Sequence, residues 1–97
     1  MLPVEIRSSA FHDAEEAHDY LQHQQDGLGW RFTEMLNLTI RRIGAFPESS
    51  AEMYRGIRCA LVPKFRYRVF YRVESTRVVV LAVRHPSREQ PDWSSLG

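Results

Sequence analysis

The stretch that most restricts the fold of this chain runs from Lys64 to Trp93, because its first part alternates with the period of a β-strand. The apolar series is Phe65, Tyr67, Val69, Tyr71 and Val73, and the series between them is Arg66, Arg68, Phe70, Arg72 and Glu74. Successive side chains of a strand point to opposite faces, so one face of this strand is apolar and the other is largely cationic. A cationic sheet face of this kind can bind an anion.

A polar break follows this strand and predicts a β-hairpin. A two-residue loop at Ser75-Thr76 places Glu74 opposite Arg77, where the two side chains form a cross-strand ion pair. The register that follows from this loop pairs Val73 with Val78, Tyr71 with Val80, Val69 with Ala82, Phe70 with Leu81 and Arg68 with Val83. The second strand, residues 77–83, is apolar on both faces and is therefore expected in the centre of the sheet.

The first half of the chain predicts a strand followed by two helices. Residues 2–7 are a strand candidate. Because Pro3 lacks a backbone N–H, either the strand lies at an edge of the sheet or Pro3 stands at the start of the strand. Ser9 is a candidate N-cap for a helix from about residue 10 to 24, and the short turn at 26–29 forces the next helix to run back antiparallel. The second helix has the strongest helical periodicity in the chain, carried by Phe32, Met35, Leu36, Thr39, Ile40 and Ile43, and it ends near Gly44 and Pro47.

A third strand candidate, residues 57–62, follows a polar link, so the order is one strand, two helices and three strands. This order predicts an α+β fold with an N-terminal strand and an antiparallel αα-hairpin packed on one face of a mostly antiparallel four-stranded sheet. The helices are expected to cover the apolar face of the strand described above and to leave the face with Arg66, Arg68 and Arg72 open. Ninety-seven residues are enough for a single domain, residues 1–97.

Cysteine content and hydropathy indicate the cellular compartment in which the protein is expected. Cys59 is the one cysteine and cannot form an internal disulfide, which favours a reducing compartment. The N-terminus has neither the basic nor the apolar region of a signal peptide, and the longest aliphatic run, residues 78–83, is too short to span a bilayer. We therefore expect a cytoplasmic protein that does not enter a membrane.

Charge is distributed unevenly along the chain, although the net charge is only +1. Residues 1–53 carry four Arg against nine acidic residues, a net charge of −5, and residues 54–97 carry nine basic residues against three acidic ones, a net charge of +6. An anionic partner would be attracted to the C-terminal half. The alternative is that these arginines only keep a solvated sheet face soluble.

The sequence contains no motif for a metal or a cofactor, and we expect neither. His12, His18 and His23 are not spaced as metal ligands, and no HExxH or CxxC pattern accompanies them. A Gly-rich phosphate loop and a nucleophile elbow are also absent. The candidate functional cluster is instead cationic and consists of Arg58, Arg68, Arg84, His85 and Arg88, with Tyr67 and Trp93 nearby.

RNA cleavage is one chemistry that this cluster could support. It requires deprotonation of the 2′-hydroxyl, neutralisation of the phosphate charge and protonation of the leaving oxygen. Arginine can neutralise the phosphate, and a histidine titrates near neutrality, so His85 could transfer a proton. The alternative for His85 is a histidine at a strand end that hydrogen-bonds the C-terminal segment. Trp93 could stack on a base, or it anchors the tail beside Pro91.

The succession of motifs in the C-terminal half resembles a known superfamily. The pattern runs Arg68-x-x-Tyr71-Arg72-Val73, a polar turn, Val78-Val79-Val80-Leu81-Ala82-Val83, His85-x-x-Arg88 and a final Trp93. It is similar to the RelE/ParE superfamily of toxins from bacterial type II toxin–antitoxin modules, and Ala14, Tyr20, residues 32–43 and Pro47 fit the N-terminal helical hairpin of that superfamily. The resemblance spans nearly the whole chain. It implies a cognate antitoxin as partner and allows for higher-order toxin–antitoxin complexes.

Two activities occur in that superfamily, and the first is nuclease activity. RelE-type members cut mRNA on the ribosome, and the resemblance then implies that Arg68 and Arg88 are catalytic, with His85 in a proton-transfer role. The paired lysines that such nucleases carry on the preceding strand correspond here to Cys59 and Leu61. Their C-terminal tyrosine corresponds approximately to Trp93, which cannot exchange a proton in this role.

The second activity is inhibition of DNA gyrase, which ParE-type members carry out without nuclease residues. Val83-Arg84-His85 and the long helical hairpin resemble this branch more closely. The expected function is therefore a ParE-like toxin, a plasmid stabilisation protein, that inhibits gyrase and is neutralised by a small antitoxin. The alternatives are a RelE-like ribosome-dependent mRNA endonuclease and a family member that binds its antitoxin without being toxic. The residues expected to bind the antitoxin or another anion are Arg58, Arg66, Arg68, Arg72 and Arg84.

Overall fold

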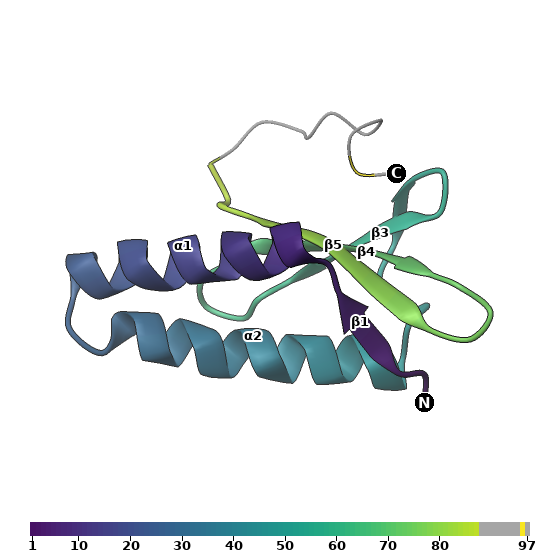
Figure 1. Cartoon of the computed structure of the whole chain (residues 1–97), viewed down its shortest axis with the longest axis horizontal. Coiled ribbons are helices and arrows are strands. Elements are labelled where there is room, and N and C mark those ends of the chain that lie inside the picture. Colours follow the sequence, from purple (N-terminus) through teal and green to yellow (C-terminus); the bar gives the residue numbers. More distant parts are fainter. Residues whose placement is uncertain (88–95, 97) are drawn as a thin grey trace.

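The computed structural model describes residues 1–87 and residue 96 and has a layer of two helices on one face of a sheet (Figure 1). The elements are β1 (Val4–Ile6), α1 (Ser8–Gln24), α2 (Leu28–Ala45), β2 (Glu52–Tyr54), β3 (Ile57–Leu61), β4 (Arg68–Val73) and β5 (Val78–Arg84). The strand order across the sheet is β1-β5-β4-β3-β2. The predicted α+β class, with its N-terminal strand and antiparallel αα-hairpin, is confirmed.

The sheet has five strands and is mixed, whereas the sequence predicts four mostly antiparallel strands. β1 runs parallel to β5, with Val4 opposite Val78, and the other neighbouring pairs are antiparallel. β2 was not predicted, because its three residues are all exposed and therefore show no alternation of polar and apolar side chains. The turn between β2 and β3 places Arg55 and Gly56 at positive φ, which glycine adopts without steric cost.

β1 lies at the sheet edge, where Pro3 predicts it. The carbonyl oxygen of Pro3 accepts a hydrogen bond from the N–H of Val78 at 2.9 Å, so β1 is attached to the start of β5. The predicted ion pair of the hairpin turn is confirmed, since Arg77 Nε lies 2.7 Å from Glu74 Oε1. Arg77 also pairs with Glu5 of β1. One arginine therefore connects the turn of the hairpin to the neighbouring edge strand.

The two helices cover the sheet face that the sequence predicts. α2 approaches α1 closely at Gly29, where a Cβ atom would lie 2.5 Å from the carbonyl oxygen of His18. The cluster between the helices and the sheet includes Ala17, Phe32, Leu36, Val62, Tyr67, Val69, Tyr71, Val78 and Val80. Burial of this apolar surface is the main force that holds the two layers together.

The predicted register of β4 and β5 is correct next to the turn and wrong beyond it. Val73 pairs with Val78 and Tyr71 with Val80, as predicted. The remaining pairs are Phe70 with Ala82, Val69 with Val83 and Arg68 with Arg84, each shifted by one residue from the prediction. Leu81 is an extra residue on β5, a β-bulge. A strand that is apolar on both faces gives no signal for such a bulge, because its pattern reads the same in either phase.

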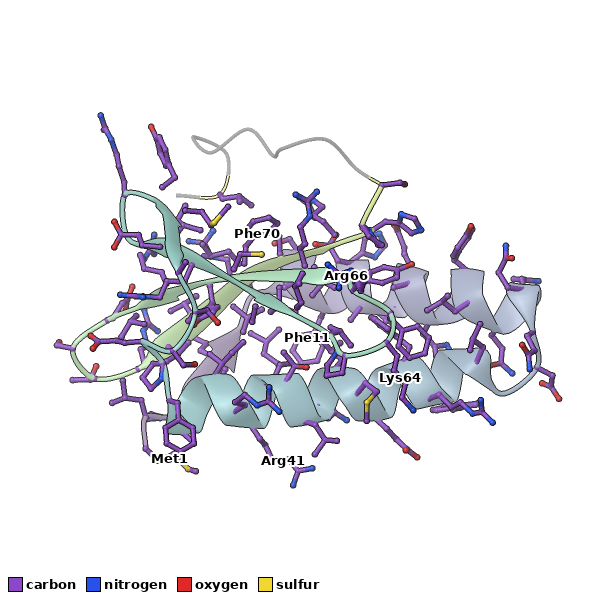
Figure 2. The ribbon with its side chains drawn as sticks, turned by 180° about the vertical axis from the view of Figure 1, so that it is seen from behind. Met1, Phe11, Arg41, Lys64, Arg66 and Phe70 are labelled. Atoms are coloured by element: carbon purple, nitrogen blue, oxygen red, sulfur yellow. The ribbon has the colours of Figure 1, made fainter. Side chains whose placement is uncertain are left out.

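β4 is shorter than the alternating pattern predicts, because residues 64–67 belong to the connection that precedes it. Lys64 and Arg66 have positive φ, and the N–H of Arg66 donates to the carbonyl of Val62 at 2.7 Å. Figure 2 shows Lys64 and Arg66 on this connection between β3 and β4. Arg66 is therefore an exposed loop residue and not part of a cationic strand face.

The sheet face away from the helices is not an open cationic face, which corrects the prediction. Its centre is a second apolar cluster of Ile57, Phe70, Val79, Leu81, Ala82 and Leu96, all buried. The carbonyl of Leu96 accepts a hydrogen bond from Arg7 Nη1 at 3.0 Å, which holds Leu96 near the start of α1. The bulge explains the burial of Leu81 and Ala82 in the same cluster, because it turns two successive side chains towards one face.

The core assignment can be tested by truncation of one helical side chain. Leu36 is buried in the cluster between helix and sheet, so Leu36→Ala should cost about 2–5 kcal/mol of unfolding free energy. Arg66→Ala, at an exposed loop position, should change the unfolding free energy by less than about 0.5 kcal/mol. Urea midpoints of both variants measure the difference, and the reverse order would show that the core is misassigned.

The Glu74–Arg77 pair should make a small contribution to stability that depends on pH. The hydrogen bond from Arg77 lowers the pKa of Glu74 below its ordinary value of 4.5. A carboxyl group whose folded pKa is lowered stabilises the fold above its unfolded pKa, and this contribution is lost as the pH falls through the folded pKa. Glu74→Gln should therefore have a lower urea midpoint than the wild type at pH 7, and the two midpoints should converge below pH 4.5. An equal difference at both pH values would show that the charge of Glu74 has no role.

Candidate functional site

The cationic side chains that the sequence groups together lie in separate places in the fold. β3 and β4 pair with Cys59 opposite Phe70 and Arg58 opposite Tyr71, so these two pairs point to opposite faces of the sheet. Arg58 is thus on the helix side. Its Nη1 atom donates to the carbonyl of Ser50 at 2.6 Å, and Tyr71 Oη donates to the carbonyl of Pro47 at 2.8 Å. These two side chains hold the segment between α2 and β2 against the sheet through hydrogen bonds. No sequence pattern indicated this role.

Arg68 and Arg72 lie on the face away from the helices, on either side of the buried Phe70. The guanidinium carbon of Arg68 is 5.6 Å from the centroid of the Phe70 ring, a cation–π distance. Arg72 Nη2 lies 3.4 Å from Glu74 Oε2. Both arginines are half-buried, so they place positive charge beside the second apolar cluster.

The same face carries the two β3 residues that occupy the lysine positions of the nucleases. Cys59 is opposite Phe70 and Leu61 is opposite Arg68. Burial raises the pKa of the Cys59 thiol, and the charge of Arg68 opposes this shift only in part. Cys59 is therefore a neutral thiol at neutral pH and Leu61 is a hydrocarbon, so neither can neutralise a phosphate.

Arg84 is opposite Arg68 in the register, but its guanidinium is bound by a carboxylate of α1. Its Nη1 atom lies 2.5 Å from Asp13 Oδ2 of α1. The same carboxylate oxygen accepts the N–H of Val83 at 3.0 Å. Asp13 thus joins the end of β5 to α1 and neutralises Arg84. The sequence contains no signal for this role, because the contact depends on the packing of α1 beside β5.

His85 lies on the helix side, at the end of β5. Its Nδ1 atom accepts a hydrogen bond from the N–H of Ser87 at 3.0 Å, so the proton of the neutral ring is on Nε2. The ring packs edge-on against Tyr67 and Tyr20, at centroid distances of 5.2 Å and 5.9 Å. A hollow of about 350 Å³ lies here, and Asp13, Glu16, Tyr20, Arg84 and His85 are among the residues that line it.

Tyr67 is poorly suited to proton transfer. It is buried, with 5% of its surface exposed, and its ring lies 4.8 Å from that of Phe32. Burial is the larger of the two influences that raise the pKa of Tyr67, and the second is the nearby Tyr20. A raised pKa leaves the phenol protonated at neutral pH, so Tyr67 is a weak general base.

Among the described residues of the hypothetical nuclease site, His85 and Arg68 are therefore not brought together. His85 and Tyr67 are on the helix side, and Arg68 is on the opposite face. Arg88 and Trp93 lie outside the described residues. Within residues 1–87 and 96, no group of three or more His, Cys, Asp or Glu side chains is placed to hold a metal ion. Neither of the described helices is long and apolar enough to cross a membrane.

Comparison with known proteins decides the family. Residues 4–90 match the family described as "ParE toxin of type II toxin-antitoxin system, parDE". The chain belongs to the ParE toxin family. The predicted superfamily and its ParE-like branch are both confirmed. No curated protein matches the sequence.

Solved structures show the same fold. Ten chains match, and one of them comes from the structure titled "Chromosomal ParDE TA system from P. aeruginosa". That chain superposes with a TM-score of 0.77 at 11% sequence identity, over 88% of this chain and 96% of the other. The fold is therefore kept at low sequence identity, which is expected when the core requires apolar volume and pattern more than particular side chains.

The contact of Asp13 with β5 can be tested by two substitutions. Asp13→Ala removes both the ion pair to Arg84 and the acceptor for the N–H of Val83, and should cost about 1.5–3 kcal/mol of unfolding free energy. Asp13→Asn keeps an oxygen that can accept the N–H of Val83, and should therefore cost less. Urea unfolding of the two variants measures both values, and equal costs would show that the backbone hydrogen bond contributes nothing.

Proposed function

We propose that this ParE family member is the toxin of a type II toxin–antitoxin pair, that it acts in the cytoplasm by inhibiting DNA gyrase, and that a small antitoxin neutralises it. The observation that carries the proposal is the match to the ParE toxin family over residues 4–90. The solved structure with the same fold is that of a ParDE toxin–antitoxin system, which supports a cognate antitoxin as partner.

The geometry of the site supports gyrase over RNA as the target. Cleavage of RNA requires a proton acceptor and a proton donor on the same side of the phosphate as the cation that neutralises it. In this fold His85 packs against Tyr67 and Tyr20 on the helix side, while Arg68 lies beside Phe70 on the other face. Inhibition of gyrase by binding needs no such arrangement.

The antitoxin should approach the cationic surface formed by Arg66, Arg68 and Arg72. Arg68 and Arg72 place positive charge on the sheet face away from the helices, and Arg66 adds an exposed charge on the preceding loop. An acidic antitoxin segment complements the charge of this surface, and an apolar residue of that segment could contact Leu61, which is exposed and lies opposite Arg68. Arg58 and Arg84 are used within the chain, for the Ser50 carbonyl and Asp13, so we assign them supporting roles.

The edge strands offer a further means of attachment. β1 and β2 are the outer strands of the sheet, with three residues each. An extended antitoxin segment can pair its backbone with such an edge while its side chains reach the arginines. A protein that wraps the toxin in this way can also join two toxins, which would produce complexes of higher order.

A supercoiling assay with purified protein separates the two targets. The wild type should inhibit gyrase and leave ribosome-bound mRNA intact, and addition of the co-expressed antitoxin should restore supercoiling. His85→Gln removes proton transfer while it keeps a similar size, so it should change gyrase inhibition by less than about threefold, whereas a nuclease would lose about a hundredfold or more. Codon-specific cleavage of translated mRNA, with gyrase unaffected, would instead establish the nuclease alternative.

A further inference from the structure

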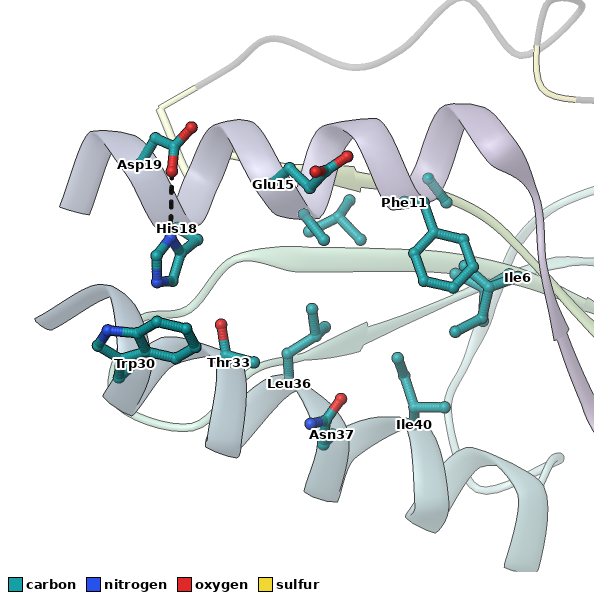
Figure 3. Close-up of a pocket in the computed structure, with 14 residues that line it drawn as sticks. Ile6, Phe11, Glu15, His18, Asp19, Trp30, Thr33, Leu36, Asn37 and Ile40 are labelled. Atoms are coloured by element: carbon teal, nitrogen blue, oxygen red, sulfur yellow. Dashed lines mark hydrogen bonds and ion pairs between the residues drawn. The ribbon is translucent and has the colours of Figure 1, made fainter. Parts of the chain in front are cut away.

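The groove between α1 and α2 is an apolar hollow of about 330 Å³ (Figure 3). Leu36 and Val83 lie among the residues that line it, and Figure 3 shows Phe11 and Ile40 towards one end and Trp30 towards the other. The two aromatic side chains are unusually exposed for their size, with 56% of Phe11 and 63% of Trp30 accessible to solvent. An exposed apolar groove of this kind marks an interaction site more often than a feature of the fold itself.

Trp30 is held in place although it is exposed. Its ring packs edge-on against His18, at a centroid distance of 4.5 Å. His18 Nδ1 in turn lies 3.2 Å from Asp19 Oδ1, and Figure 3 shows this pair above Trp30. The indole is therefore oriented before a partner arrives, which reduces the conformational entropy lost on binding. Tryptophan side chains in such positions frequently carry a large share of binding energy.

The charge around the groove is acidic. Glu15 and Asp19 line it, and among the described residues no Lys or Arg does. α1 as a whole contains four carboxylates and no Lys or Arg. The three arginines of α2, Arg31, Arg41 and Arg42, do not line the groove. A partner that enters the groove therefore meets apolar surface flanked by negative charge, the reverse of the cationic surface formed by Arg66, Arg68 and Arg72.

We propose that this groove is the contact surface for gyrase, an inference that rests on the proposed function. The groove receives a basic segment of gyrase that carries an apolar or arginine anchor. This segment belongs to the surface with which gyrase holds DNA. An enzyme that acts on DNA neutralises phosphates with Lys and Arg, so its DNA-contacting surface is basic. A guanidinium can stack on the exposed face of Trp30 and pair with the carboxylate of Asp19 or Glu15. The acidic flank of the groove thus takes the place of phosphate charge.

Opposite charge assigns the two partners to two surfaces. The antitoxin proposed above is acidic and would be repelled by Glu15, Asp19 and the other carboxylates of α1. A basic gyrase segment would be repelled by Arg66, Arg68 and Arg72 for the same reason. Binding of the two partners should consequently respond to different substitutions.

The first test reverses the charge of the groove. Glu15→Lys combined with Asp19→Lys should raise the concentration of toxin that half-inhibits gyrase supercoiling by about tenfold or more. The matched control is Glu34→Lys combined with Glu48→Lys, which makes the same charge change at exposed positions outside both the groove and the edge strands and should stay within about twofold of the wild type. Both double variants should bind the purified antitoxin with wild-type affinity in a calorimetric titration, which also shows that they are folded.

The second test removes the aromatic anchor without a change in charge. Trp30→Ala should weaken gyrase inhibition by about tenfold or more. Met53→Ala, which truncates another exposed apolar side chain outside the groove, should not. The urea midpoint of each variant identifies any loss that comes from unfolding, and Trp30→Phe, which keeps an aromatic ring, should recover part of the inhibition.

The possible failures are distinguishable. If the groove variants inhibit gyrase as well as the wild type, the groove is not the contact surface and the inference is wrong. If they inhibit gyrase normally but no longer bind the antitoxin, the groove belongs to the antitoxin and the inference is equally wrong. If the wild type itself does not inhibit gyrase, the proposed function fails, and the inference that rests on it fails too.

Discussion

The burial of β5 on both of its faces is the constraint on which the rest of the structure depends. Residues 78–83 are all buried, with the helices on one face and the second apolar cluster, including Leu96, on the other. β5 also has a strand on each side, since β1 pairs with it in parallel and β4 pairs with it antiparallel. A strand in this position loses its contact with water on every side, so the remaining elements are arranged around it.

The bulge at Leu81 determines which side chains each layer receives. Without it, Ala82 would face the helices, and the small alanine would leave space where Val83 now packs. The bulge also brings Arg84 opposite Arg68 at the end of the hairpin, where Asp13 of α1 takes up one of the two charges. A single extra residue in the strand therefore links the packing of the core to the distribution of charge at the sheet edge.

The uneven charge of the sequence becomes a separation of surfaces in the fold. Four of the nine acidic residues of the N-terminal half lie on α1, which has no Lys or Arg. The arginines of the C-terminal half are divided between the opposite sheet face, the loop before β4 and contacts within the chain. Under the function proposed above, this division matters because the toxin has to contact two different proteins, gyrase and the antitoxin. Surfaces of opposite charge discriminate between partners through repulsion as much as through attraction.

Much of the fold follows from the sequence, because local patterns carry it. The helical periodicity of Phe32, Leu36 and Ile43, the alternation in residues 65–74 and the Glu74–Arg77 turn each depend on neighbours in the chain. The structure agrees with the first and the last, and with the alternation over β4, residues 68–73. The succession of these patterns was also sufficient to indicate the superfamily. Patterns of this kind survive at low identity because burial requires a period and a volume, and not a particular residue.

What the sequence by itself determined is thus the class of the fold, the order of its elements and the sign of the charge in each half. Only the tertiary structure decided the bulge at Leu81, the exposed strand β2, the contacts of Arg58 and Asp13 within the chain, and the groove between α1 and α2. The physical reason is that these features arise between residues distant in the chain. A strand that is apolar on both faces has no preferred phase, and a charged side chain does not reveal in sequence whether its partner is a carbonyl, a carboxylate or another protein.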